Sequence, residues 1–181
     1  MTPMRGPARP GTAVPEEKKI IQLATFLVGE QEYALDIMRI KEIINPLKIT
    51  PVPKTPLFIE GVVELRGAIL PIVDLRKRFD LPASQRTRST KYIIVSIEGR
   101  IIGLIVDAVG EVLRVPRGEV RPAPGLESAD GGDYWSGVCH VAGRIIMVLN
   151  IDRILSSQEK ISLSGLGAAV LPPTPKEGVE S

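Results

Sequence analysis

The sequence predicts a mainly β protein, built as two small five-stranded barrels packed side by side, with only short helices. Three observations lead to this prediction. Hydrophobic residues make up 44% of the chain but aromatic residues only 4%, so the core is built from Ile, Val and Leu, which favours strands. Sixteen prolines and seventeen glycines in 181 residues indicate frequent turns and short strands. A unit of turn, strand and Asp or Asn also recurs four times, twice in each half of the chain.

Composition divides the chain into a central domain and two tails. Residues 1–18 are rich in proline and glycine, which predicts a disordered N-terminal tail. Residues 161–181 have the same character and predict a flexible C-terminal tail. Between the tails we expect one ordered domain over residues 19–160, with a first half over about 19–81 and a second half over about 91–157.

The first half begins with a predicted hairpin. Ile20–Val28 and Glu32–Asp36 are apolar runs on either side of a Gly-Glu-Gln turn, which is the pattern of two antiparallel strands. The carboxylate of Asp36 can cap a helix that follows it. We expect that helix over Ile37–Ile44, where isoleucines recur at spacings of three and four and so share one helical face.

A second hairpin follows a proline-rich stretch. Leu47–Val52 is predicted as a short edge strand, and Thr55-Pro56 as the start of a helical turn. Gly61–Leu75 is then the densest run of strand-forming residues in the chain. Its one interruption, Arg66-Gly67, predicts a tight turn, because glycine readily adopts the positive φ that such turns need. Pro71, inside the second strand, predicts an edge position or a bulge.

The second half is predicted to hold two more hairpins, each turning at a glycine. They pair Tyr92–Ile97 with Ile101–Asp107, and Trp135–Val141 with Arg144–Leu149.

One unit is common to all four hairpins. A turn glycine is followed seven or eight residues later by Asp or Asn, and then by an apolar residue that opens a helical turn. The four predicted caps are Asp36, Asp74, Asp107 and Asn150. The first and third lie 71 residues apart, and the second and fourth 76. We therefore expect two related halves, each a small barrel of about five strands, because closure removes exposed strand edges.

Residues suited to catalysis or metal binding are few. Cys139 is the only cysteine and His140 the only histidine. Neighbours on a strand point to opposite faces, which prevents a thiol–imidazole pair. The two residues cannot form a multi-cysteine zinc site, and no glycine-rich phosphate loop precedes a long helix. We expect no enzymatic activity, cofactor or metal; an enzyme that uses Cys139 is the alternative.

Charge and hydropathy argue against two further classes of protein. The net charge is only +2 and no basic run is interleaved with aromatic residues, which disfavours nucleic-acid binding. No apolar run approaches the ~20 residues of a membrane span, and the N-terminus lacks a signal-peptide pattern. We expect a cytoplasmic protein that does not insert into a membrane.

Two charges that lie beside apolar stretches are candidate binding residues. Arg66 lies at the turn of the Gly61–Leu75 hairpin, two residues after Glu64, and Glu42 lies on the predicted helix. Arginine has five donors and an apolar stem, which suit the rim of a protein interface. Ordinary solvated surface charges are the alternative for both residues.

Four segments, in this order and at this spacing, resemble the CheW family of chemotaxis coupling proteins: EYALDIMRIKEII, TPLFIEGVVELRGAILPIVDLRKRF, GLIVDAVGEVL and EVRPAP. The resemblance covers roughly Lys19–Gln158. It implies two SH3-like barrels and a non-enzymatic adaptor. Such adaptors bridge the cytoplasmic tips of methyl-accepting chemoreceptors to the regulatory domain of the histidine kinase CheA, itself a CheW-like fold. The implied location is a membrane receptor array, alongside other CheW-like domains.

The resemblance also implies site residues. The expected receptor contacts are Ile40, Glu42, Ile43, Glu64 and Arg66. The expected kinase contacts are Leu47, Ile49 and Gly61. Glu64 stands where the family motif usually has Asn, and its charge can pair with Arg66 or change which receptor is preferred. An adaptor of a related pathway with another output is an alternative role.

Overall fold

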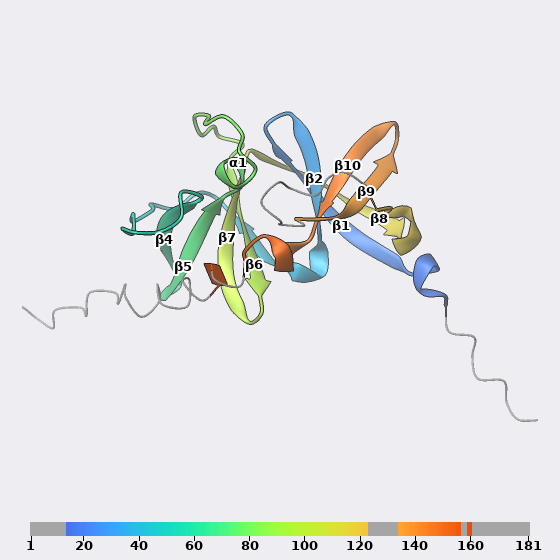
Figure 1. Cartoon of the computed structure of the whole chain (residues 1–181), viewed down its shortest axis with the longest axis horizontal. Helices are drawn as coiled ribbons and strands as arrows, with labels where there is room; N and C mark the ends of the chain where they lie inside the picture. Colours follow the sequence, from blue (N-terminus) through green and yellow to red (C-terminus); the bar gives the residue numbers. More distant parts are fainter. Residues whose placement is uncertain (1–13, 123–133, 157–158, 161–181) are drawn as a thin grey trace, which may run out of the picture.

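The computed structural model describes residues 14–122, 134–156 and 159–160. Its ten strands form two five-stranded sheets that lie side by side (Figure 1). The mainly β prediction is confirmed. The predicted C-terminal tail, 161–181, lies outside the described residues. Within the predicted N-terminal tail, the described part includes a 3-10 turn, η1 (Glu16–Lys18).

The first sheet has the strand order β8-β1-β2-β10-β9. Its strands are β1 (Ile20–Val28), β2 (Gln31–Asp36), β8 (Ala108–Pro116), β9 (Trp135–Val141) and β10 (Arg144–Leu149). The second sheet has the order β3-β6-β7-β5-β4. Its strands are β3 (Ile40–Ile44), β4 (Ile59–Leu65), β5 (Ala68–Asp74), β6 (Lys91–Ile97) and β7 (Arg100–Val106). Helical turns lie between these strands at η2 (Ile37–Arg39), α1 (Leu75–Arg78) and η3 (Arg117–Glu119), and η4 (Ile151–Arg153) follows β10.

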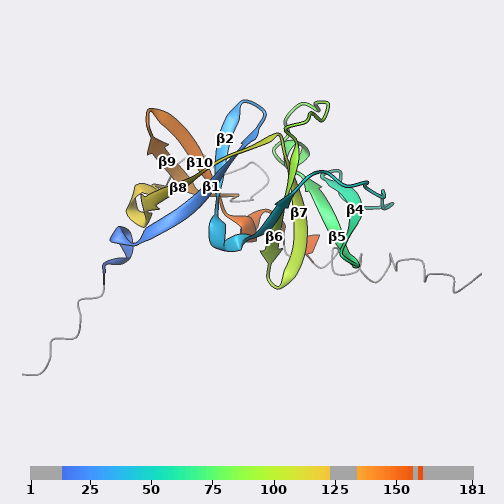
Figure 2. The same ribbon diagram turned by 180° about the vertical axis from the view of Figure 1, so that it is seen from behind.

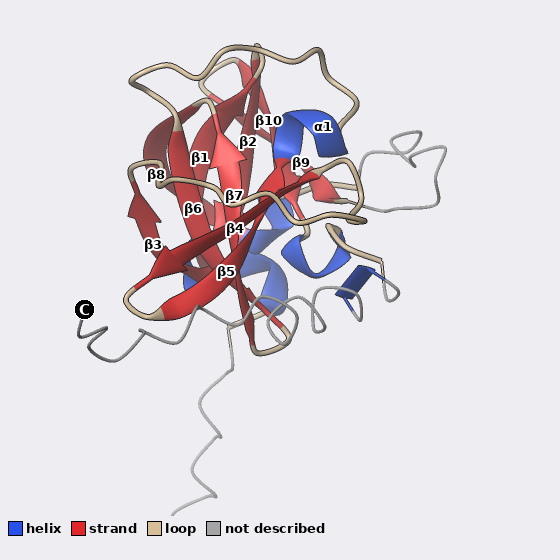
Figure 3. Cartoon of the chain, turned by 90° about the vertical axis from the view of Figure 1, so that its left-hand side faces the viewer, coloured by secondary structure: helices blue, strands red, loops and turns tan. Residues whose placement is uncertain are grey.

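An isolated backbone bridge joins the two edges of each sheet. Thr50, in the segment after β3, exchanges hydrogen bonds with Val62 of β4; the N···O distances are 2.8 and 2.9 Å. Arg121 and Val138 make the equivalent bridge in the first sheet, at 2.9 and 2.8 Å. The sheets therefore curl into two small barrels, called barrel A (first sheet) and barrel B (second sheet). Figure 3 looks onto barrel B, with the β4–β5 hairpin nearest the viewer.

The sequence halves are related, but neither half forms a barrel by itself, so the predicted barrel composition is wrong. Barrel A combines β1 and β2 with β8–β10, and barrel B combines β6 and β7 with β3–β5. Figures 1 and 2 show blue strands beside orange ones, and green strands together in the other barrel. After its second strand, each half crosses to the opposite barrel. A repeat in the sequence cannot reveal this exchange. The same strands could form two barrels of one half each, or two barrels that each combine strands from both halves.

Three apolar cores result from this arrangement. Barrel A encloses one, around Leu23, Ile146 and Val148, and barrel B encloses another, around Ile72, Tyr92 and Ile94. The third and largest lies between the barrels and draws on both sheets; it includes Phe26, Leu35, Ile93, Val95 and Leu104. On β6, alternate residues therefore face the inside of barrel B or the other barrel. Burial on both faces explains the continuous apolar runs of the sequence.

The helix expected over Ile37–Ile44 is wrong beyond its first turn. Only η2 is helical, and β3 begins at Ile40. The carboxylate of Asp36 does accept from the backbone N–H of Met38 at 2.9 Å, as a cap should. The isoleucine spacing fits a helix face, but β-branched residues also favour strands. Pairing with β6 decides the outcome, because Ile43 lies opposite Ile93 in the register.

Two shorter predictions also need correction. Residues 47–52 form no strand and contribute only the bridge at Thr50. Residues 55–61 contain no helix, and the hydroxyl of Thr55 donates back to the carbonyl of Val52 at 3.1 Å.

The hairpin predicted within Gly61–Leu75 is confirmed. Arg66 and Gly67 have φ values of 51° and 79°, and two successive positive values are those of a type I′ turn. Pro71 lies within β5, which has β4 on one side and β7 on the other, so the predicted edge position is wrong. The parallel pairing with β7 begins only at Ile72. Pro71 therefore lies where the strand has no ladder partner on its β7 side, and a missing N–H is tolerated there.

Gly61 permits the closure of barrel B. A Cβ at this residue would lie 2.2 Å from the carbonyl oxygen of Thr50 and 2.8 Å from Cγ2 of Ile49. Gly137 stands in the same relation to Arg121 in barrel A, at 2.4 Å. Both glycines have a positive φ, of 146° and 156°, which side chains strongly disfavour.

We predict that Gly61→Ala lowers the free energy of unfolding by about 2–4 kcal/mol, because the new methyl group must displace the closing bridge. Urea unfolding followed by circular dichroism measures this change. Gly67→Ala is the matched control: it also has a positive φ but open space around it, and should cost about 1 kcal/mol. Equal losses for the two variants would contradict the role of Gly61 in closure.

Candidate functional site

Arg66 and Glu42 meet at one end of barrel B. Glu42 lies on β3 and Arg66 at the β4–β5 turn, so they come from opposite edges of the sheet and only barrel closure brings them together. Arg66 Nη2 donates to Glu42 Oε2 at 2.8 Å, and Nη1 donates to Oε1 in a second, short contact. The guanidinium fork thus faces the carboxylate through two parallel hydrogen bonds, which fixes its orientation.

The two partners differ in exposure. The Arg66 side chain is 72% exposed and that of Glu42 only 27%. The hydrogen bonds from Arg66 lower the pKa of the Glu42 carboxyl, and those to Glu42 raise the pKa of the guanidinium. Both groups are therefore charged at neutral pH. Glu42 uses one edge of the guanidinium, and the remaining N–H groups face solvent.

The Arg66–Glu42 pair covers an end of the barrel B core. Ile44, two residues after Glu42 on β3, and Leu65, next to Arg66, both pack against that core. Barrel A has a related arrangement at its β9–β10 hairpin. Arg144 donates to Glu111 of β8 at 2.7 Å and to Glu32 of β2 at 3.0 Å. In each barrel, an arginine of the hairpin at one edge of the sheet thus reaches a glutamate on the strand at the other edge.

The remaining expected receptor residues lie apart from one another. Ile40 packs against the core between the barrels, while Ile43 is 40% exposed. Because β3 is a strand and not the expected helix, Glu42 and Ile43 point to opposite faces of it. Glu64 is exposed on β4, opposite Ile69. Arg66 pairs with Glu42, so of the two roles considered for Glu64, pairing with Arg66 and a change of receptor preference, the first is not the one observed.

Two of the three expected kinase residues are internal. Gly61 is buried at the closing bridge, and Ile49 packs against the barrel B core. Leu47 is 36% exposed, and its carbonyl accepts a hydrogen bond from the hydroxyl of Tyr92 at 3.3 Å. The position of the exposed Leu47 side chain therefore depends on Ile49 and Gly61, because their packing holds the segment that follows β3 in place.

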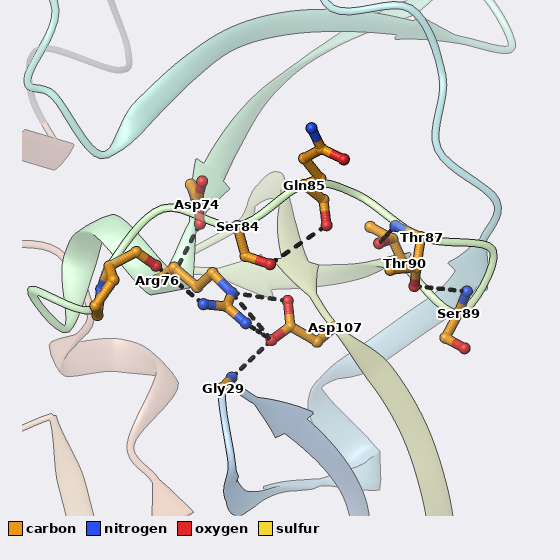
Figure 4. Close-up of polar contacts among 10 residues, drawn as sticks. Gly29, Asp74, Arg76, Ser84, Gln85, Thr87, Ser89, Thr90 and Asp107 are labelled. Carbon is orange, nitrogen blue, oxygen red and sulfur yellow. Dashed lines mark hydrogen bonds and ion pairs between the residues drawn. The ribbon is translucent and has the colours of Figure 1, made fainter.

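An ion pair that was not predicted from the sequence, Arg76–Asp107, joins the two barrels (Figure 4). Arg76 of α1 donates from Nε and Nη2 to Asp107, at 3.0 and 2.6 Å. Asp107 also accepts from the backbone N–H of Gly29 in the β1–β2 turn, at 2.6 Å. Arg76 reaches the carbonyl of Pro82 as well, at 2.9 Å. Hydrogen bonding to Asp107 raises the pKa of the Arg76 guanidinium.

Asp107 is the one predicted cap that does not cap a helix. Asp74 and Asn150 do so, accepting from the N–H groups of Arg76 at 2.9 Å and Asp152 at 3.2 Å. The residues after Asp107 form β8 instead of a helical turn. The β-branched residues Val109, Val112 and Val115, which favour strands, were the available sign of β8.

A second ion pair joins the barrels through η2 and η4. Arg39 donates from Nη1 to Asp152 Oδ2 at 3.0 Å, and Nη2 makes a short contact with Oδ1. The same Nη2 donates to the carbonyl of Ser96 on β6 at 3.2 Å. These hydrogen bonds lower the pKa of the Asp152 carboxyl. The two ion pairs and the shared core fix the position of one barrel against the other.

Cys139 lacks the surroundings of a nucleophile. It is fully buried in the barrel A core, and burial raises the pKa of its thiol. His140 is exposed, on the other face of β9. Within the described ranges, no three His, Cys, Asp or Glu residues lie close enough together to hold a metal ion. The described helices are all too short or too polar to cross a membrane.

We predict that Arg76→Met lowers the free energy of unfolding by about 2 kcal/mol, because Asp107 is left half-buried without its cation. Lys19→Met is the control, since the Lys19–Glu16 pair is exposed on both sides and should contribute nothing measurable. Urea titrations compare both variants with the parent chain. An Arg76→Met midpoint as high as that of Lys19→Met would show that the pair does not hold the barrels together.

Comparisons with known proteins agree with this architecture. Residues 22–159 match the family model described as "CheW-like domain". A chemotaxis protein CheW from Rhizobium meliloti is 35% identical over 139 residues, covering 77% of this chain and 90% of that protein. One from Treponema pallidum is 34% identical over 149 residues, covering 80% and 88%.

A solved structure agrees as well. The crystal structure of the scaffolding protein TtCheW from Thermoanaerobacter tengcongensis matches with a TM-score of 0.72 and 32% identity, covering 78% of this chain and 96% of that one. The family match includes strands β2–β10 in full and β1 from Gln22 onward. The chain therefore belongs to the CheW family and is a non-enzymatic scaffold protein of chemotaxis.

Proposed function

We propose that this scaffold couples methyl-accepting chemoreceptors to a CheA-type histidine kinase, and that the receptor tip binds at the Arg66–Glu42 pair. The observation that carries the proposal is the exposed guanidinium of Arg66, held in one orientation by Glu42. A fixed, solvent-facing arginine presents its free N–H groups to a partner without first losing side-chain freedom. A carboxylate or a main-chain carbonyl of the receptor is the fitting acceptor.

Residues near the Arg66–Glu42 pair are proposed to supply an apolar contact with the receptor and to select between receptors. Ile43 is the exposed apolar residue of β3, and Glu64 is an exposed acid on the hairpin that carries Arg66. Ile40 supports the same strand from the core between the barrels. A receptor helix that offers apolar groups to Ile43 and avoids a carboxylate opposite Glu64 is the preferred partner, since like charges discriminate strongly between partners.

The kinase is proposed to bind the segment after β3. Leu47 is the exposed contact, while Ile49 and Gly61 shape the segment from within. This segment and the β4–β5 turn are separate parts of barrel B, so both partners can be held at once. Many such weak contacts in an array of receptors, kinases and other CheW-like domains give a stable assembly at the membrane surface.

We predict that Arg66→Glu weakens binding of receptor tips by about tenfold or more while kinase affinity stays within about twofold. The substitution reverses the outward charge and breaks the pair. Pulldown and isothermal titration with separately purified receptor tips and kinase regulatory domain measure both affinities. Arg144→Glu is the matched control, because it breaks the corresponding cluster in barrel A and should leave receptor binding unchanged.

The double variant Glu42→Arg with Arg66→Glu separates the two roles of the pair. It restores an internal ion pair but keeps the reversed outward charge, so stability should return while receptor binding stays weak. Equal loss of receptor and kinase binding in Arg66→Glu would mean a folding defect or a shared surface. Unchanged binding of both partners would refute the assignment of Arg66.

A complementary result is expected at Leu47. Leu47→Asp places a charge on the proposed kinase surface and should weaken kinase binding by about tenfold, with receptor binding retained. Lys48→Asp changes the charge at the neighbouring exposed residue and controls for electrostatics alone. If Lys48→Asp has the same effect as Leu47→Asp, the contact is not an apolar one.

A further inference from the structure

We propose that a cavity between the two barrels docks a third partner, a protein segment in which a large apolar side chain lies next to a lysine or an arginine. This site goes beyond the proposed receptor and kinase contacts and does not depend on them. The cavity has a volume of about 550 Å³, within the ~300–1,000 Å³ that is usual for binding pockets. Leu57, Phe58, Leu81 and Tyr134 form its apolar lining.

The cavity lies where three separate parts of the chain meet. Leu57 and Phe58 directly precede β4, and Leu81 follows α1, so these residues belong to barrel B. Tyr134 directly precedes β9 of barrel A, and its carbonyl accepts from the backbone N–H of Asn150 at 2.7 Å. α1 lies at the junction of the two barrels (Figure 1). Both barrels therefore form the cavity, and the contacts between them determine its shape.

Arg78 holds the wall of the cavity in place. Its guanidinium carbon lies 4.2 Å from the centroid of the Phe58 ring and 4.9 Å from that of Tyr134. The same side chain donates to both carboxylate oxygens of Glu159, at 3.1 and 3.0 Å, and to the carbonyl of Ile154 at 2.8 Å. It is only 11% exposed. One cation thus fixes two rings from different barrels, and a partner binds this preformed wall without having to order it.

The cavity opens to solvent beside Leu57. This side chain is 88% exposed, more than any other large apolar side chain of the described residues. Phe58 and Tyr134, in the same lining, are largely buried. A partner side chain that enters the cavity therefore covers an exposed leucine and reaches two aromatic rings, and the burial of apolar surface favours its binding. An open site of this kind suits a segment of a protein chain better than an enclosed small molecule.

The charged groups of the cavity favour a basic partner. Its lining also includes Lys77, Arg78 and Asp80. Arg78 already has a carboxylate partner, and Lys77 pairs with Glu60, which Arg86 also approaches at 3.8 Å. In the part of the chain that the structure describes, no lysine or arginine pairs with the exposed carboxylate of Asp80. Asp80 is therefore the charge of the cavity that is open to a partner, and a lysine or an arginine complements it.

The cavity is separate from the proposed receptor site. Phe58 directly precedes β4, and Arg66 directly follows it. A strand rises about 3.3 Å per residue, so about 20–25 Å of β4 lies between the two residues. One chain can therefore hold a partner in the cavity and a receptor at Arg66 at the same time.

The test titrates the full ¹⁵N-labelled chain with short synthetic peptides. The basic probes are acetylated and amidated hexapeptides Gly-Ser-X-Z-Ser-Gly, in which X is leucine or phenylalanine and Z is lysine or arginine; the acidic probes have aspartate or glutamate as Z. Amide chemical shifts at Leu57, Asp80 and Leu81 should change with the basic probes and reach saturation. The basic probes should bind at least about fivefold more tightly than the acidic ones.

Two variants separate the apolar and the charged contact. Asp80→Asn should weaken binding of the basic probes about three- to tenfold, because it removes the charge but keeps a side chain that tolerates the φ of 55° at this residue. Leu57→Ser should weaken it by a similar factor. Glu17→Gln and Ile145→Ser, at an exposed acid and an exposed apolar residue of the chain before and within barrel A, are the matched controls and should leave the affinity unchanged.

Three results would overturn the proposed site. Basic probes that produce no saturable shift changes at Leu57, Asp80 or Leu81 would refute docking in the cavity. Equal affinity for basic and acidic probes, or an Asp80→Asn variant that binds as the parent chain does, would refute the basic partner. Shift changes centred on Arg66 would mean that the probes bind at the proposed receptor surface instead.

Discussion

The exchange of strands between the two barrels is the constraint on which the rest of the structure depends. Each barrel takes two strands from one half of the chain and three from the other. The largest core lies between the barrels and is lined by both sheets. Because neither half can complete a barrel alone, folding must bring distant segments together, and Arg76–Asp107 and Arg39–Asp152 then fix the result. A scaffold that holds two partners benefits from this rigidity, since its two surfaces keep a constant relative position.

Barrel closure also creates the candidate receptor site. Glu42 and Arg66 belong to strands at opposite edges of one sheet, and they meet only because Gly61 allows the backbone of Thr50 to approach. A residue buried in the fold thus controls the position of an exposed one. A substitution at a buried residue such as Gly61 is therefore expected to weaken binding even though that residue does not contact the partner.

Much of the fold could be predicted from the sequence. The β-branched composition, the glycine turns and the recurring capped unit indicate ten short strands in two related halves, and the Arg66-Gly67 turn and three of the four caps are as predicted. The exchange of strands could not be predicted, because a local pattern does not say which half supplies a strand's neighbour. The isoleucine spacing at 37–44 was misleading for a similar reason: the pairing partner on β6 lies some fifty residues away.

The candidate site, too, could be predicted from the sequence only in part. Arg66 and Glu42 stand out in the sequence as charges beside apolar stretches, but their mutual pairing depends on closure and is not visible there. Asp107 was given a local role, since the sequence could not show that Arg76 and Gly29 approach it. Ile49 and Gly61 carry no polar group, so only their packing distinguishes an internal role from a surface contact.

The central claim is that the end of barrel B bearing the Arg66–Glu42 pair is the surface that binds the receptor. The most direct measurement is a titration of the ¹⁵N-labelled chain with an unlabelled receptor tip, followed by amide chemical shifts. We expect the largest changes at Glu42, Ile43 and Arg66, with the Arg144 hairpin of barrel A unaffected. Changes confined to barrel A, or the same changes around Arg144 as around Arg66, would contradict the account.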